Sequence, residues 1–159
     1  MDRRRFLFAL PAAAALHAQP QAVPRFSGRT MDGQKFDTDS LKGKPALLQF
    51  WTTWCGYCRK DQPALEQLHK EYVPAQLSML AINVNEPREK VEEYLKQSPR
   101  SPKIVLSSDT DLVKLVAPRG FPVYILLDKN GMMVHRQDGS GGILALRQML
   151  LEVGLQKGS

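Results

Sequence analysis

The chain has 159 residues, of which 22 are Lys or Arg and 16 are Asp or Glu, and its formal net charge is +6. This length fits one domain with room for a hydrophobic core. The basic residues stand singly among acidic ones, which excludes the clustered charge of a nucleic-acid binder, so we expect no nucleic-acid partner.

The first 18 residues have the pattern of an export signal. Arg3, Arg4 and Arg5 precede an apolar run over residues 6–16, and small residues precede residue 19. The run is shorter than the roughly 20 residues that a membrane-spanning helix needs. Arg-Arg-Arg-Phe-Leu also fits the twin-arginine export pattern. We therefore expect residues 1–18 to direct export by the general secretory or the twin-arginine route, and to be cleaved or retained as a membrane anchor.

The first half of the domain begins with a Pro-rich tether over residues 19–24. Asp32-Gly33 lies between two short stretches and predicts a hairpin over 26–36, with a helical turn over 39–44 behind it. The apolar run 46–51 predicts a central strand that is covered on both faces. Apolar residues at helical spacing predict a helix over 56–72, bent at Pro63.

The second half alternates strands and helices. It is expected to contain strands at 77–84 and 103–106, helices at 87–97 and 109–116, a strand at 122–127 that turns back at 132–136, and a last helix at 143–153. This order predicts a single α/β domain over residues 25–159, built as a three-layer sandwich around a central mixed sheet.

Both cysteines of the chain lie in Cys55-Gly56-Tyr57-Cys58. A disulfide across so short a loop constrains the unfolded chain little, so it is a poor structural bridge. A zinc site would need two more ligands, and His69 and His135 lie far away in sequence, so we expect no metal and no cofactor. The spacing predicts a redox-active pair.

The position of the pair assigns the two roles. Cys55 follows a strand and a short connection and begins a helix, where backbone N–H groups and the helix dipole stabilise a thiolate. We expect Cys55 to be exposed and to attack a substrate disulfide. Cys58, one turn inward, would then attack Cys55 to release the product.

Two segments carry a resemblance to a known family. They are similar to segments of the thioredoxin superfamily and, within it, of the TlpA/ResA-like periplasmic reductases. The first is residues 48–58, Leu-Gln-Phe-Trp-Thr-Thr-Trp-Cys-Gly-Tyr-Cys, and the second is residues 120–128, Gly-Phe-Pro-Val-Tyr-Ile-Leu-Leu-Asp. The resemblance implies a thioredoxin-like sandwich with an N-terminal hairpin extension. It also implies that Pro122 is cis and lies beside the cysteines, and that the backbone of Phe121 pairs with the substrate's cysteine segment.

The resemblance also points to further site residues. Thioredoxin-like proteins commonly keep a buried acid on the active-site strand, where this chain has Gln49. TlpA/ResA-like reductases tend to have a Glu six residues after the first cysteine, where this chain has Asp61. Asp61 is either the base for Cys58 or a solvated acid at the start of a helix. Trp54 and Tyr57 are expected to contact the substrate.

The resemblance favours a periplasmic reductant of exported proteins, such as apocytochrome c, that a membrane thiol transporter recharges. We expect a monomer. An oxidant or isomerase is the alternative, because Gly56-Tyr57 also occurs in DsbC-like isomerases. A peroxidase would place its cysteine in a Thr/Ser-x-x-Cys setting, and a copper carrier of the Sco type would have Cys-x-x-x-Cys with a histidine. Here Cys55 is preceded by Trp54 and belongs to a Cys-x-x-Cys pair, which argues against both classes.

Overall fold

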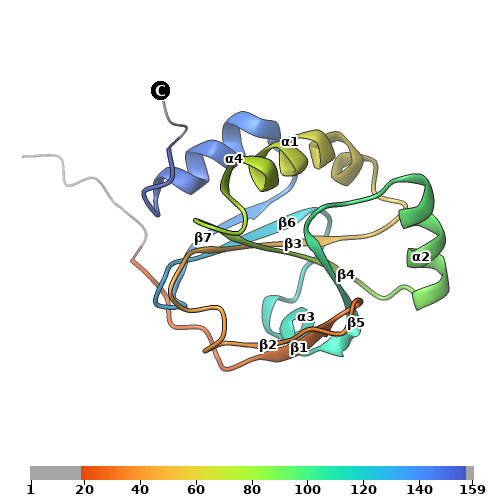
Figure 1. The fold of residues 1–159 in the computed structure, drawn as a ribbon, viewed down its shortest axis with the longest axis horizontal. Helices are drawn as coiled ribbons and strands as arrows, with labels where there is room; N and C mark the ends of the chain where they lie inside the picture. The colour runs from red at the N-terminus through yellow and green to blue at the C-terminus, as the bar shows by residue number, and fades with distance from the viewer. Residues whose placement is uncertain (1–18, 157–159) are drawn as a thin grey trace, which may run out of the picture.

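A seven-stranded mixed sheet organises residues 19–156, the part of the chain that the computed structural model describes (Figure 1). The strand order is β2-β1-β5-β4-β3-β6-β7. The strands are β1 (Ser27–Thr30), β2 (Lys35–Asp37), β3 (Ala46–Trp51), β4 (Ser78–Asn83), β5 (Lys103–Thr110), β6 (Val123–Leu127) and β7 (Met133–Asp138). The helices are α1 (Gly56–Tyr72), α2 (Arg88–Gln97), α3 (Leu112–Val116) and α4 (Gly142–Leu151).

The central strand β3 carries the active-site motif into the core. It runs parallel to β4 and antiparallel to β6, and all six of its residues are buried. A strand with neighbours on both edges and layers on both faces has no solvated side, which explains its unbroken apolar sequence. The predicted strand over residues 46–51 is confirmed.

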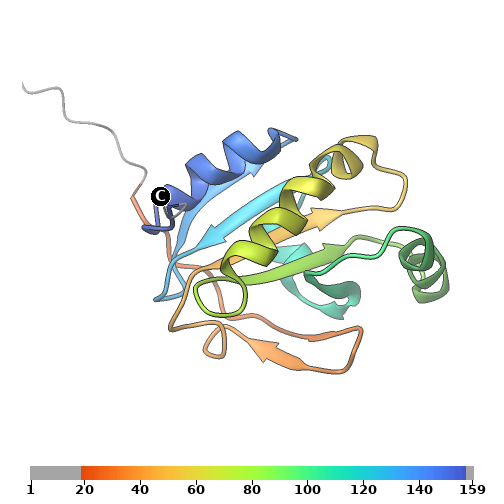
Figure 2. The same cartoon turned by 45° about the horizontal axis from the view of Figure 1, so that its top comes forward.

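The two faces of the sheet are covered by different elements. Leu47 of β3 packs in one cluster with α1 and α4, which cross the same face of the sheet (Figure 2). Leu48 and Phe50 point to the opposite face, where they share a cluster with Leu112 of α3 and with Phe36 of the N-terminal hairpin. Successive side chains of a strand point to opposite faces, so β3 joins both layers. The predicted three-layer α/β sandwich is confirmed.

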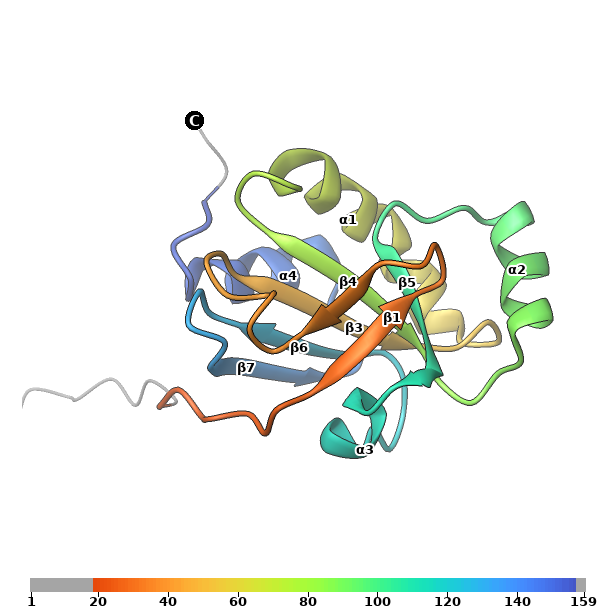
Figure 3. The ribbon, with the colours of Figure 1, turned by 60° about the horizontal axis from the view of Figure 1, so that its bottom comes forward.

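The N-terminal hairpin extends the sheet at one edge. β1 and β2 pair antiparallel, and β1 also pairs antiparallel with β5 (Figure 3). Gly28 of β1 is required by this packing, because a Cβ atom there would lie 2.4 Å from the ring of Phe36. The hairpin expected over residues 26–36 is confirmed. The helical turn was expected over residues 39–44, and the structure has hydrogen-bonded turns over residues 38–43 before β3.

The boundary between β5 and α3 differs from the sequence prediction. β5 extends to Thr110, and α3 begins at Leu112 rather than at residue 109. Thr110 pairs with Gly28, and the Thr110 hydroxyl donates a hydrogen bond to the Ser27 carbonyl at 2.8 Å. Pairing with a strand some 80 residues earlier, which no local pattern signals, therefore keeps residues 107–110 extended.

The expected tether makes a sheet contact. Gln21 and Met133 of β7 exchange two backbone hydrogen bonds of 2.8 Å. The export signal expected over residues 1–18 lies outside the described residues. Across residues 19–156, no helix has the length and apolar character needed to span a membrane.

Candidate active site

The cysteine pair lies at the junction between the end of β3 and the start of α1. β3 ends at Trp51, and Cys55 is the N-cap of α1 with φ −78° and ψ 106°. The Cys55 sulfur accepts a hydrogen bond from the Cys58 backbone N–H at 3.1 Å, in the manner of an N-cap oxygen. The two cysteines are joined by a disulfide, with their Cα atoms 5.3 Å apart. The pair thus has the N-terminal helix position that favours a thiolate at Cys55.

The expectation that Cys55 is exposed is wrong for this disulfide form. Cys55 is 4% exposed and Cys58 is fully buried. Both belong to a cluster with Trp51, and Phe121 packs against that cluster. The ring of Trp54 meets the Phe121 ring edge-on, with centroids 5.9 Å apart. Aromatic side chains from two separate loops therefore surround the pair and limit solvent access to its sulfurs.

The peptide bond between Phe121 and Pro122 is cis, as the resemblance implies. Pro122 is buried immediately before β6, and Phe121 is half-buried beside the cysteine cluster. Trp54 and Tyr57, the other two expected contact residues, are 64% and 62% exposed. The structure therefore brings Trp54 and Phe121 together at the redox pair, with Tyr57 projecting into solvent between the cysteines.

Asp61 is a buried acid, so the interpretation as a solvated acid is wrong. It is 1% exposed and lies one turn after Cys58 on the buried side of α1. One carboxylate oxygen accepts the Tyr124 hydroxyl at 2.8 Å. The other accepts the Ser140 hydroxyl at 2.5 Å and the Gly142 backbone N–H at 3.0 Å. Asp61 thereby ties α1 to β6 and to the start of α4, and among the described residues it has no hydrogen bond to either cysteine.

A polar chain continues from Asp61 into the core. Burial first, and then the charge and hydrogen bond of Asp61, raise the pKa of Tyr124 well above its ordinary value, so its hydroxyl keeps its proton. The amide nitrogen of Gln49 donates to the Tyr124 oxygen at 3.3 Å. The Gln49 oxygen accepts from Arg100 at 3.1 Å. A cation thus faces the strand position where thioredoxin-like proteins commonly have an acid.

A second acid, Glu86, whose side chain is 4% exposed, fixes the loop before Cys55. The Glu86 carboxylate accepts the Thr53 backbone N–H at 2.8 Å and the Thr53 hydroxyl at 2.6 Å. It also accepts the Asn83 amide at 2.7 Å and pairs with Lys90 at 2.8 Å. Although burial opposes ionisation, these hydrogen bonds lower the pKa of Glu86 to about 2. Glu86 therefore holds the connection between β3 and Cys55 in place.

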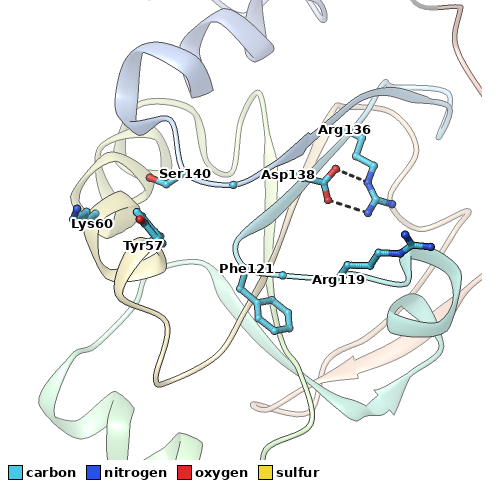
Figure 4. A pocket seen from close by; sticks show the side chains of 9 residues that line it. Tyr57, Lys60, Arg119, Phe121, Arg136, Asp138 and Ser140 are labelled. Atoms are coloured by element: carbon cyan, nitrogen blue, oxygen red, sulfur yellow. Dashed lines mark hydrogen bonds and ion pairs between the residues drawn. The ribbon is translucent and has the colours of Figure 1, made fainter.

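A groove of about 840 Å³ opens beside the pair (Figure 4). We call it the basic groove, and its lining includes Tyr57, Lys60, Arg119, Phe121, Arg136 and Asp138. Arg136 holds Asp138 through two hydrogen bonds of 3.0 Å and also donates to the Val116 carbonyl at 2.8 Å. Since Tyr57 lies between the cysteines and Phe121 packs against them, the groove passes directly beside the redox pair.

Sequence reasoning missed Glu86, Arg100 and Tyr124. Each lies more than 25 residues from the cysteines. Glu86 and Arg100 belong to no motif, and Tyr124 lies within residues 120–128, where nothing local marks it as a partner of Asp61. Their partners are set by the register between strands and by the packing of α2 against β3. Over residues 19–156 no group of three His, Cys, Asp or Glu side chains is arranged to hold a metal ion.

Comparisons with known proteins place this site in a family. Residues 18–142 match the family model described as Redoxin. The chain is 32% identical over 132 residues to thioredoxin-like protein YneN of Bacillus subtilis. The aligned region covers 81% of this chain and 75% of that protein. It is 30% identical over 122 residues to thiol-disulfide oxidoreductase ResA of Halalkalibacterium halodurans, covering 77% and 69%.

A solved structure shows the same fold. The thiol:disulfide interchange protein of the thioredoxin family from Chlorobium tepidum is 26% identical, covers 86% of this chain and 97% of that chain, and superimposes with a TM-score of 0.72. The chain spans about two thirds of the length of the curated relatives it matches. The chain belongs to the Redoxin family and is a thiol:disulfide oxidoreductase of the ResA type, with Cys55 and Cys58 as its redox pair.

Proposed function

We propose that the protein is a periplasmic reductant that transfers two electrons from its dithiol to disulfides of exported proteins, apocytochrome c among them. The observation that carries this proposal is the position of Cys55 as the N-cap of α1, with Cys58 buried one turn behind it. The basic pattern of residues 1–18 supports export, and a membrane thiol transporter is the proposed source of electrons.

The exchange proceeds in two steps. The Cys55 thiolate attacks one sulfur of the substrate disulfide, and the other substrate sulfur leaves as a thiolate that takes up a proton. The Cys58 thiol then loses its proton and attacks the Cys55 sulfur, which releases the second substrate thiolate. The substrate gains two electrons and two protons, and the Cys55–Cys58 disulfide forms.

Asp61 is our proposed acceptor of the Cys58 proton. It is a buried acid on the same side of α1, one turn after Cys58. A buried carboxylate near the pair also disfavours thiolates by repulsion of like charge, which stabilises the disulfide form and lowers the reduction potential. The charge repulsion favours a protein that gives electrons away, and the proton acceptor accelerates the exchange.

The substrate would pair with the loop at Pro122. Phe121 and Trp54 meet at the cysteines, and Tyr57 projects from between them. We propose that the substrate's cysteine segment lies against the Phe121 backbone, with Trp54 and Tyr57 as side-chain contacts. The rings must separate for substrate sulfur to reach Cys55, because Cys55 is only 4% exposed.

The reduction potential of the pair tests the proposed direction. It is measured by equilibration with dithiothreitol or glutathione, and a value near about −250 mV or lower supports a reductant. A value between about −120 and −180 mV would make the protein an oxidant or isomerase instead. A Cys58→Ala variant expressed with its native leader would trap substrates as mixed disulfides on Cys55, and their location would test periplasmic residence.

A further inference from the structure

We propose that the basic groove binds acidic side chains on either side of the substrate cysteine, so that the preferred substrates are polypeptides with Asp or Glu near their disulfide. This inference rests on the proposed reductase function and adds to it the chemical class of the substrate.

Two of the groove's three cations are free to pair with a ligand. Arg136 is already held by Asp138 and by the Val116 carbonyl. Lys60 and Arg119 are exposed, and neither forms an ion pair with any residue between 19 and 156. The nearest described interaction of Lys60 is with the face of the Tyr57 ring, whose centroid lies 5.2 Å from the ammonium nitrogen. The groove therefore carries two unneutralised positive charges.

These two cations lie at opposite ends of the groove (Figure 4). Lys60 is one turn after Tyr57 on α1, and Arg119 lies two residues before Phe121 (Figure 4). In this arrangement, a polypeptide whose cysteine reaches Cys55 through the groove would pass between Tyr57 and Phe121. Acidic residues before and after that cysteine would then face Lys60 on one side and Arg119 on the other.

A polypeptide fits the groove better than a small anion does. The groove of about 840 Å³ is open, and its floor includes the exposed Tyr57 ring and the backbone of Gly120 and Gly139. Its cations come from separate elements, with Lys60 of α1 at one end and Arg119 and Arg136 at the other (Figure 4). An extended chain with spaced carboxylates matches this distribution of charge. Exposed charge pairs contribute modestly to affinity but raise the rate of encounter.

The test compares three peptide disulfides that differ only in the two residues on each side of cysteine, which are glutamate, glutamine or lysine. The second-order rate constant for reduction by the dithiol protein is measured at about 20 mM and about 1 M ionic strength, where the Debye length is roughly 20 Å and 3 Å. We expect the glutamate peptide to react about tenfold faster than the glutamine peptide at low salt, the lysine peptide to be slowest, and the differences to shrink at high salt.

A matched pair of double variants distinguishes an effect of the groove on the rate constant from an effect of the protein's overall charge. Lys60→Gln with Arg119→Gln should bring the glutamate-to-glutamine ratio within about twofold of one. Lys70→Gln with Lys129→Gln removes the same charge from the far end of α1 and from the turn after β6, and should keep the wild-type ratio.

Equal rate constants for the three peptides in the wild type, or the same loss of preference in both double variants, would overturn the inference. The neutral substrate bis(2-hydroxyethyl) disulfide identifies what has failed. If the wild-type dithiol protein reduces it but shows no preference among the peptides, the acidic-substrate inference fails alone. If the protein reduces neither it nor the peptides, the proposed reductase function fails as well.

Discussion

The guanidinium of Arg100, the last member of the hydrogen-bonded chain that begins at Asp61, lies 3.7 Å from the centroid of the Trp51 ring. Trp51 packs in turn against Cys55 and Cys58. Burial lowers the pKa of Arg100, but an arginine keeps its charge at neutral pH. The redox pair is therefore packed against a ring that carries a half-buried cation on one face, while a buried acid follows Cys58 on α1.

Replacing Arg100 should change the reduction potential. Arg100→Met removes the cation that opposes the charge of Asp61, so thiolates become less favourable and the potential becomes more negative. We expect the equilibrium constant with glutathione to shift by three- to tenfold, or about 15 to 30 mV. Arg100→Lys keeps the charge and should stay near the wild-type potential, even if it loses stability. Equal shifts in both variants would show that packing rather than charge sets the effect.

Replacing Asp61 should slow the second step of exchange. In Asp61→Asn the proposed proton acceptor of Cys58 is lost, so resolution of the mixed disulfide should slow by about 10²-fold or more, while attack by Cys55 changes less. Stopped-flow kinetics with a fluorescent peptide disulfide separate the two steps across pH. Ser140→Ala removes one donor to Asp61 and leaves the carboxylate in place, so it serves as the control. Unchanged resolution in Asp61→Asn would leave Asp61 a purely structural anchor.

Replacing Glu86 should loosen the loop before Cys55 and change the acid sensitivity of the fold. The folded-state pKa of Glu86 is about 2, below its ordinary 4.5, because Lys90, Thr53 and Asn83 donate to it against the cost of burial. The lowered pKa of Glu86 contributes at most about 3 kcal/mol to the free energy of unfolding. This contribution is fully present above pH 4.5 and is lost as the pH falls toward 2.

Urea unfolding of Glu86→Gln between pH 7 and pH 2.5 checks this expectation. The variant should be about 2 to 3 kcal/mol less stable at pH 7, and its stability should fall less between pH 4.5 and 2.5 than that of the wild type. Glu92→Gln, on the neighbouring helix α2, removes an acid whose side chain is 49% exposed and should change stability little. A parallel pH dependence in the wild type and in Glu86→Gln would contradict the assignment.

Replacing Phe121 should expose the attacking thiol. Phe121→Ala removes the ring that meets Trp54 edge-on and packs against the cysteine cluster. In the dithiol form, alkylation of Cys55 by iodoacetamide should accelerate several-fold, and mass spectrometry identifies the modified cysteine. Phe121→Leu retains most of the apolar cover and should react at nearly the wild-type rate. If both variants react as the wild type does, the ring does not limit access to Cys55.

Much of the central layer follows from local sequence. The apolar run of β3 and the helical spacing of α1 are properties of a few consecutive residues, and both elements match their predicted bounds. The cysteine spacing within the first turn of α1 fixes a pair that a single helical turn brings together. The cis bond before Pro122 was inferred from the family motif around it, and the structure confirms it.

The tertiary structure alone decided how the pair is surrounded. Gln49 meets Arg100 across 51 positions of sequence, and Asp61 meets Tyr124 across 63. The burial of Cys55 depends on Phe121, which another loop supplies, and the extension of β5 to Thr110 depends on its pairing with β1. Hydrophobic periodicity reports which face of an element is buried, but it carries no information about which distant side chain lies opposite. The sequence by itself therefore determined the redox pair and the layers around it, whereas the partners of its buried charges were decided by strand register and helix packing.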